Sequence, residues 1–83
     1  MYKIISHKSA EKKLDKLTQN WRLRIVKALD SIAYNPYIGK RLQGELEGCL
    51  RIRIGDLRII YSIYEKEKIV IVHSIGSRGD IYK

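Results

Sequence analysis

In the first half of the segment 50–61, hydrophobic and polar positions alternate, and this pattern predicts a β-strand rather than helix. The first half places Arg51 and Arg53 on one face, because side chains two positions apart point to the same side of a strand. Gly55-Asp56 then interrupts the pattern and is typical of a two-residue hairpin turn. A turn of that length pairs Arg53 directly with Arg58, so all three arginines lie on one side of a sheet.

The expected pairing of Arg53 with Arg58 is unfavourable in isolation. Like charges directly opposite each other destabilise a hairpin by up to about 1 kcal/mol. A protein tolerates this repulsion more readily when an anion lies between the side chains, and guanidinium groups bind phosphate oxygens in a bidentate manner. The hairpin therefore predicts a phosphate-binding surface built on rigid strands.

Helical periodicity precedes the hairpin and predicts two helices. Ser6 or Ser9 is expected to cap the first helix, which runs to about Leu17. Its apolar stripe continues through Ala10 and Leu14, and lysines occupy the opposite side.

The second helix is expected to begin after Thr18-Gln19-Asn20, which offers an N-cap. It should end near Tyr34, because Asn35-Pro36 disfavours helix at the residue before proline. Its apolar positions follow at near-helical spacing and are Trp21, Ile25, Leu29 and Ile32.

The remaining segments predict a sheet. A first strand is expected at residues 2–6, and a glycine-containing loop at 36–48 precedes strands at 49–54, 57–64 and 68–75. The order β-α-α-β-β-β predicts a two-layer α+β fold, in which a helical hairpin packs on one face of a mainly antiparallel four-stranded sheet. If Tyr64 pairs with Ile69 across the last turn, His73 lies opposite Ile60 and Ile75 lies opposite Arg58.

The amino-acid composition and net charge indicate which kinds of molecule this protein is expected to bind. The 83 residues correspond to a single domain, and the net charge of +8, from 17 Lys+Arg against 9 Asp+Glu, attracts polyanions. Nucleic acid is the leading partner, with an acidic protein or an anionic membrane surface as alternatives. The sequence lacks a transmembrane-length apolar run and a secretory signal, so a cytoplasmic protein is expected. With one cysteine and no zinc-type Cys/His spacing, no metal site is expected.

The segment after the last strand carries two further candidate residues. Gly76 and Gly79 would allow the chain to fold back across the strand ends. Arg78 and Tyr82 would then reach the rim of the arginine surface.

Several of these motifs together resemble the RelE/ParE toxin superfamily of toxin–antitoxin systems. They are the βααβββ order, Asn35-Pro36, Lys40-Arg41-Leu42-Gln43-Gly44, and the segments 51–61 and 76–82. The resemblance covers essentially the whole chain, residues 1–83. The RelE branch contains ribosome-dependent endoribonucleases that cleave mRNA in the A site, whereas the ParE branch shares the fold and inhibits DNA gyrase.

The resemblance also implies a set of functional residues. RelE-type toxins carry two basic residues on the second strand, an arginine on the third, an arginine after the fourth and a tyrosine near the C-terminus. The matching positions are Arg51, Arg53, Arg58, Arg78 and Tyr82. By this resemblance, an mRNA 2′-hydroxyl attacks the adjacent phosphodiester, all but Arg51 take catalytic roles, and Arg51, Arg53 and Arg58 bind the RNA phosphates. No cofactor is implied, and the implied partners are a RelB-like antitoxin, the ribosome and mRNA.

The identity of the general base stays open at this stage. Lysine occupies the second-strand positions in some relatives, whereas the pKa of arginine, about 12.5 or higher, makes it a poor base. Tyr82 is the leading candidate, with Glu45, Glu47 and His73 as lesser ones. Two other functions also stay open, namely a ParE-like gyrase inhibitor that is not an enzyme and an RNA-binding module without activity.

Overall fold

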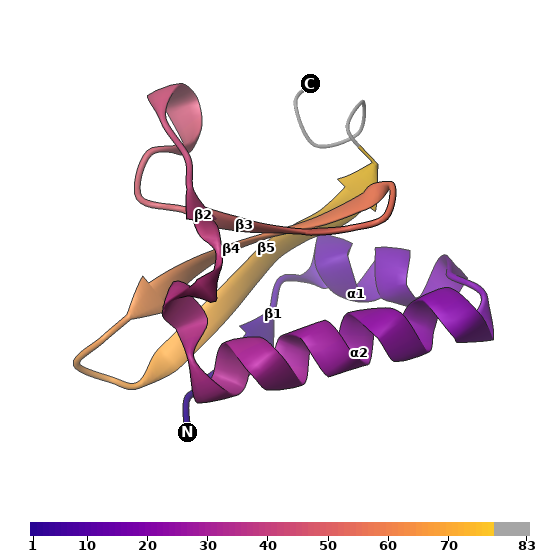
Figure 1. Ribbon diagram of the computed structural model, residues 1–83, viewed down its shortest axis with the longest axis horizontal. Helices are drawn as coiled ribbons and strands as arrows, with labels where there is room; N and C mark the ends of the chain where they lie inside the picture. The colour runs from indigo at the N-terminus through magenta and orange to yellow at the C-terminus, as the bar shows by residue number, and fades with distance from the viewer. Residues whose placement is uncertain (78–83) are drawn as a thin grey trace.

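Two helices lie on one face of a five-stranded sheet in the computed structural model, which describes residues 1–77 (Figure 1). The strand order is β1-β5-β4-β3-β2, with β1 parallel to β5 and every other neighbouring pair antiparallel. The strands are β1 (Lys3–Ser6), β2 (Lys40–Arg41), β3 (Leu50–Ile54), β4 (Leu57–Tyr64) and β5 (Ile69–Ser77). The predicted α+β class and helix placement are confirmed.

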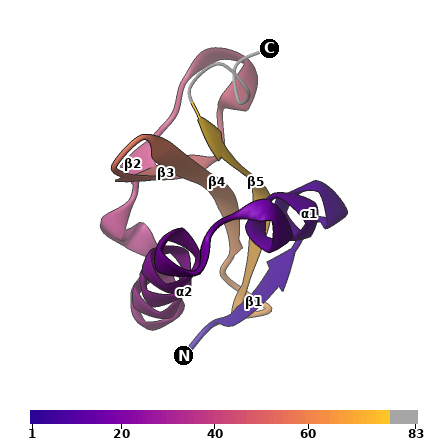
Figure 2. The same ribbon diagram turned by 90° about the vertical axis from the view of Figure 1, so that its right-hand side faces the viewer.

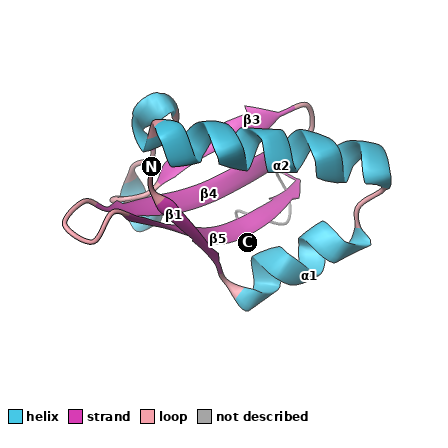
Figure 3. Cartoon of the chain, turned by 90° about the horizontal axis from the view of Figure 1, so that it is seen from below, coloured by secondary structure: helices cyan, strands magenta, loops and turns pink. Residues whose placement is uncertain are grey.

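The helices α1 (Lys8–Lys16) and α2 (Gln19–Tyr34) cover the same face of the sheet, as the view from the helix side shows (Figure 3). Between them and the sheet lies the hydrophobic core. Fully buried core side chains come from both layers and include Ala10, Ile25, Ile32, Ile59, Val70 and Val72. Each buried Ile or Val contributes about 1.5–3 kcal/mol relative to exposure, so this layer contact supplies much of the stability.

The predicted ends of the helices are largely confirmed, with one correction. The N-cap of α1 is His7 rather than Ser6 or Ser9, and its Nδ1 accepts a hydrogen bond from the backbone N–H of Ser9 at 3.2 Å. The N-cap of α2 is Thr18, within the predicted segment Thr18-Gln19-Asn20, so the helix begins at Gln19, earlier than expected. The helix α2 ends before Asn35, whose side chain then caps the 3₁₀ turn η1 (Pro36–Ile38).

The prediction of four strands was wrong by one, because the segment 36–48 contains the two-residue edge strand β2. The Tyr61 side chain holds the segment that leads into this strand. Its buried hydroxyl donates to the carbonyl of Pro36 at 2.6 Å and accepts from the N–H of Gly39 at 3.1 Å. A Cβ atom at Gly39 would lie 2.3 Å from that hydroxyl, so glycine is required there. A second 3₁₀ turn, η2 (Gly44–Leu46), lies between β2 and β3.

The predicted register of the β3–β4 hairpin is confirmed, with Arg53 opposite Arg58 and Ile54 opposite Leu57. Gly55 adopts a φ of 59°, which fits the first central position of a type II′ turn. The turn lies against α2, since a Cβ atom at Gly55 would be 2.7 Å from the Trp21 ring.

The predicted register between β4 and β5 holds for only part of the pair. Tyr64 lies opposite Ile69 as expected, but a β-bulge follows at His73. Beyond the bulge, Ile60 pairs with Ser74 rather than His73, and Arg58 pairs with Gly76 rather than Ile75. The extra residue turns Ile75 into the core, where it is 6% exposed, because a bulge shifts which residues face each side.

At the tip of the β4–β5 hairpin, three side chains converge on the Glu65 carboxylate. The Tyr2 hydroxyl and the Lys68 ammonium donate to it at 2.7 Å, and the Tyr37 hydroxyl also donates. These bonds, chiefly that from Lys68, lower the pKa of Glu65 to about 2. The bond to Glu65 raises the pKa of Tyr37 to about 12. The cluster ties the N-terminal segment and η1 to the hairpin tip.

Neither α1 nor α2 is long and apolar enough to cross a membrane, and residues 1–77 hold no other α-helix.

Candidate functional site

Arg51, Arg53 and Arg58 share the face of the sheet opposite the helices, and we call them the arginine face. Their neighbours in the strands, including Ile52, Leu57 and Ile59, point into the helix-covered core. The alternation of side chains therefore leaves the three arginines on the other side, as predicted. In Figure 2 both helices lie on one side of the curved sheet that β3, β4 and β5 form.

Two members of the arginine face, Arg53 and Arg58, carry positive charge that no carboxylate within residues 1–77 neutralises. Arg53 is exposed, and its Nε donates to the carbonyl of Gly55 at 3.3 Å. Arg58 is half-buried, and its Nε is buried without a hydrogen-bond partner. Since buried donors are nearly always paired in folded proteins, this atom indicates a site for an acceptor from outside residues 1–77.

The bulge at His73 changes what lies beside Arg58. Without the bulge, Ile75 would be its cross-strand neighbour; with it, the neighbour is Gly76. A glycine has no side chain to compete with the Arg58 guanidinium for space. The bulge thus places the branched apolar side chain in the core and keeps it off the arginine face.

A second polar group lies on the same face of the sheet. The hydroxyl of Ser62 and Nε2 of His73 form a hydrogen bond between β4 and β5. Burial, together with the nearby His7, lowers the pKa of His73. The sequence marks His73 as a candidate base and does not mark Ser62. The predicted pairing of Tyr64 with Ile69, which is confirmed, places Ser62 opposite Ile71 and diagonal to His73.

This arrangement of fold and arginines can be compared with known proteins. The family model described as ParE toxin of type II toxin-antitoxin system, parDE, matches residues 4–82, which is nearly the whole chain. The chain belongs to the RelE/ParE superfamily of type II toxins. The predicted family is thereby confirmed. No curated protein matches the sequence of this toxin.

Solved toxin structures have the same fold. A chain of the RelBE2 toxin–antitoxin complex from Mycobacterium tuberculosis is 26% identical, with a TM-score of 0.83 over 93% of this toxin and 98% of that chain. A chain of the archaeal RelE–RelB complex from Pyrococcus horikoshii is 29% identical, with a TM-score of 0.76 over 94% and 96%. The isolated E. coli RelE toxin is 25% identical, with a TM-score of 0.82 over 93% and 84%.

None of the other described residues predicted for the site lies beside the three arginines. Arg78 and Tyr82 lie outside the described residues. Glu45 is exposed in η2, and Glu47 lines a separate cavity. His73 lies three residues along β5 from Gly76, and therefore about 10 Å from the neighbour of Arg58 at the usual rise of a strand.

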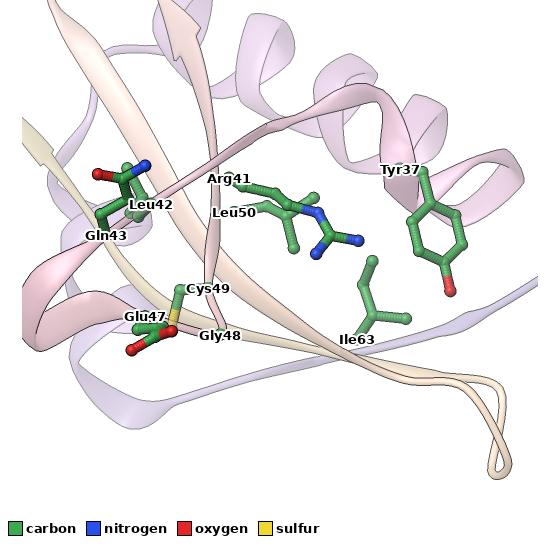
Figure 4. Close-up of a pocket in the computed structure, with 9 residues that line it drawn as sticks. All are labelled: Tyr37, Arg41, Leu42, Gln43, Glu47, Gly48, Cys49, Leu50 and Ile63. Atoms are coloured by element: carbon green, nitrogen blue, oxygen red, sulfur yellow. The ribbon is translucent and has the colours of Figure 1, made fainter.

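The cavity near β2 has a volume of about 350 Å³ (Figure 4). Its walls come from η1, β2, the segment between β2 and β3, and one residue each of β3 and β4. None of the three residues of the arginine face lines it. The lining residues are Tyr37, Arg41, Leu42, Gln43, Glu47, Gly48, Cys49, Leu50 and Ile63. Figure 4 shows the Arg41 guanidinium directed toward Ile63 and Tyr37, with Glu47 and Cys49 grouped at the other end.

The described part of this toxin, residues 1–77, contains no group of three or more His, Cys, Asp or Glu side chains arranged to hold a metal ion.

Proposed function

We propose that this toxin is a ribosome-dependent endoribonuclease that cleaves mRNA in the A site and so inhibits translation. The observation that carries the proposal is the arginine face itself. Among residues 1–77, the cross-strand partners Arg53 and Arg58 have no neutralising carboxylate, and the Arg58 Nε is buried and unpaired. This arrangement suits a phosphate group of the substrate, which would supply both the missing charge and the missing acceptor.

The proposed reaction begins with attack of an mRNA 2′-hydroxyl on the adjacent phosphorus. The bond to the 5′-oxygen of the next nucleotide breaks, which leaves a 2′,3′-cyclic phosphate and a 5′-hydroxyl. Negative charge builds on the phosphoryl oxygens in the five-coordinate transition state. Guanidinium groups carried on strands, as those of Arg53 and Arg58 are, stabilise that charge with little reorganisation. We assign this role to Arg53, Arg58 and Arg78, and phosphate binding to Arg51, Arg53 and Arg58.

The described residues beside the arginines do not include a good general base for proton transfer. Arginine is a poor base, and His73 lies about 10 Å along β5 from Gly76 beside Arg58. We assign the proton-transfer role to Tyr82. A site of this kind depends on accurate placement of the 2′-hydroxyl, and the ribosome can supply that orientation. The toxin is therefore expected to cleave free RNA poorly and ribosome-bound mRNA efficiently.

The second candidate function is inhibition of DNA gyrase without catalysis. The matching family model, which is described as a ParE toxin, favours it. The basic arginine face would then bind an acidic protein surface or DNA rather than position a scissile phosphate.

We further propose that a RelB-like antitoxin binds this toxin in the cytoplasm. The support is that the complexes from M. tuberculosis and P. horikoshii each pair a similar toxin with an antitoxin. The net charge of +8 favours an acidic segment in such a partner.

Inducible expression in bacteria tests the choice between the two functions. Cells expressing the toxin or its Arg58→Ala variant are pulse-labelled for protein and DNA synthesis, and mRNA 5′ ends are mapped. The ribonuclease proposal predicts a prompt halt of translation, with cuts in translated messages that vanish in the variant. Arrested DNA synthesis with continued translation would favour the gyrase inhibitor instead. Lys27→Ala, an exposed change on α2, is the matched control and should behave like the unaltered toxin.

A further inference from the structure

The face of the sheet opposite the helices continues well beyond the arginines. Along β4, Arg58, Ile60, Ser62 and Tyr64 alternate with residues of the core and so share this face, although Ile60 is only 2% exposed. On the neighbouring strands, Ile71 lies opposite Ser62, and Ile5 lies beside Ile71. A strand of nucleic acid bound at Arg58 and running along β4 would therefore cross Ser62 and His73.

The Ser62–His73 pair is held in a fixed position. Ser62 is bonded to the His73 ring across the strands. The Ser9 hydroxyl, at the start of α1, donates to the carbonyl of His73 at 3.2 Å. The bulge at His73 is thus held at two points. The His73 side chain is bonded to Ser62 of β4, and the His73 carbonyl is bonded to Ser9 of α1. Such prior ordering lowers the entropy cost of binding a ligand.

The pair has hydrogen-bonding capacity left over. A serine hydroxyl offers one donor and two acceptor positions, and a neutral imidazole offers one of each. The Ser62–His73 hydrogen bond uses one hydrogen-bonding position of each side chain. Burial and the nearby His7 lower the pKa of His73, which favours the neutral ring. Its second ring nitrogen then serves as a donor or as an acceptor, according to the tautomer. A neutral donor–acceptor pair matches the edge of a nucleobase better than it matches a phosphate.

Exposed apolar and aromatic surface surrounds the pair. The side chain of Tyr64 is 45% exposed and that of Ile5 is 41% exposed, although both lie on strands of the sheet. Ile71 lies between them and is half-buried. Aromatic and apolar side chains on an open sheet are the usual platform on which single-stranded bases stack.

We propose that Ser62 and His73 form a subsite for an unpaired RNA base, stacked near Tyr64 and hydrogen-bonded on its edge. This inference rests on the proposed RNA substrate and deepens it. Ser62 is four residues from Arg58 along β4, a separation of about 13 Å, which corresponds to a few nucleotides of a single strand. The subsite therefore reads a base near the cleaved phosphate and is not part of the reacting centre.

Binding of RNA that cannot be cleaved tests the subsite apart from the catalytic proposal. Purified toxin is titrated with fluorescent 2′-O-methyl oligoribonucleotides of A, U or C, and affinity is followed by anisotropy. The unaltered toxin should prefer one base over the others by about fivefold or more. Ser62→Ala and His73→Gln should bring the three affinities to within about twofold of one another, because the phosphate contacts remain.

Two comparison variants separate the outcomes. Arg58→Ala should weaken binding of all three oligomers alike, which leaves the base preference unchanged. Ser31→Ala removes an exposed hydroxyl from α2, which lies on the other side of the sheet, and should leave all three affinities unchanged. Circular dichroism and Tm identify any variant that fails to fold, and Ser62→Ala remains informative if His73→Gln does not fold.

The two proposals fail in different ways. If the unaltered toxin binds all three oligomers equally, or if Ser62→Ala keeps the preference of the unaltered toxin, the subsite is overturned while the ribonuclease proposal stands. If the unaltered toxin binds none of the oligomers and leaves ribosome-bound mRNA intact, both proposals are overturned.

Discussion

Arg53 and Arg58 are direct cross-strand partners in the β3–β4 hairpin, on the face of the sheet opposite the helices. Two permanent positive charges in this position repel each other, and no carboxylate in residues 1–77 pairs with either one. The fold holds this arrangement at a cost in stability. An anionic substrate phosphate would offset that cost on binding.

Replacing Arg53 with glutamine should therefore increase the stability of the protein and weaken its binding of RNA. We expect Arg53→Gln to raise the free energy of unfolding by up to about 1 kcal/mol, since it removes a like-charge pair. The same change should weaken RNA binding and reduce the salt slope of log affinity by about one unit, because one phosphate contact is lost. Urea denaturation and RNA titration at several salt concentrations measure the two effects.

Arg41→Gln is the control for this experiment. Arg41 lies on the edge strand β2, opposite Leu50, and is exposed. Its replacement removes the same charge without touching the Arg53–Arg58 pair, so stability should change little. Equal stabilisation by the two variants would show that net charge, rather than the cross-strand pair, is responsible.

Gly55→Ala should destabilise the hairpin by about 2 kcal/mol, for two reasons that act together. The φ of 59° is unfavourable for alanine, and the new Cβ would lie 2.7 Å from the Trp21 ring. Gly44→Ala separates the two causes. Gly44 has a φ of 73°, but nothing lies within 4 Å of its Cβ position. Its replacement should cost less in urea denaturation, and an equal cost would rule out a contribution from the Trp21 contact.

The hydrogen bonds to Glu65 should make the free energy of unfolding depend on pH at both low and high pH. The pKa of Glu65 is lowered to about 2, against about 4.3 in an unfolded chain, so the contribution is complete above about pH 5 and is lost as the pH falls toward 2. The pKa of Tyr37 is raised to about 12, so its contribution is present below about pH 10 and is lost as the pH rises through 12.

Thermal unfolding of Glu65→Gln measured across pH checks this account. The variant should have a lower Tm than the unaltered toxin at pH 7, and the difference should shrink toward pH 2. Glu67→Gln, an exposed change in the same turn, is the control and should leave the pH profile unchanged. A Tm difference for Glu65→Gln that is as large at pH 2 as at pH 7 would contradict the assignment.

Local sequence signals predicted the central part of the site. The Gly55-Asp56 turn fixed the register of β3 and β4, because a two-residue loop leaves one pairing and alternation then places Arg51, Arg53 and Arg58 together. The helices were predicted for the same reason, since their apolar stripes and the Asn35-Pro36 stop are local features.

The features that were missed depend on contacts distant in sequence. The bulge at His73 follows from packing Ile75 into the core, which no alternation within residues 69–77 reveals. The strand β2 has two residues and exists because Tyr61 and Gly39 fix the chain beside β3. Arg78 and Tyr82 lie outside the described residues, so their roles remain proposals.

Cleavage of mRNA on purified ribosomes tests the central claim most directly. Programmed ribosomes with an open A site are mixed with the toxin or with Arg58→Ala, and the RNA ends are analysed chemically. We predict cleavage within the A-site codon that yields a 2′,3′-cyclic phosphate and a 5′-hydroxyl, and a loss of about 100-fold or more in rate for the variant. Intact mRNA with the unaltered toxin, or cleavage that proceeds equally well without Arg58, would contradict the account.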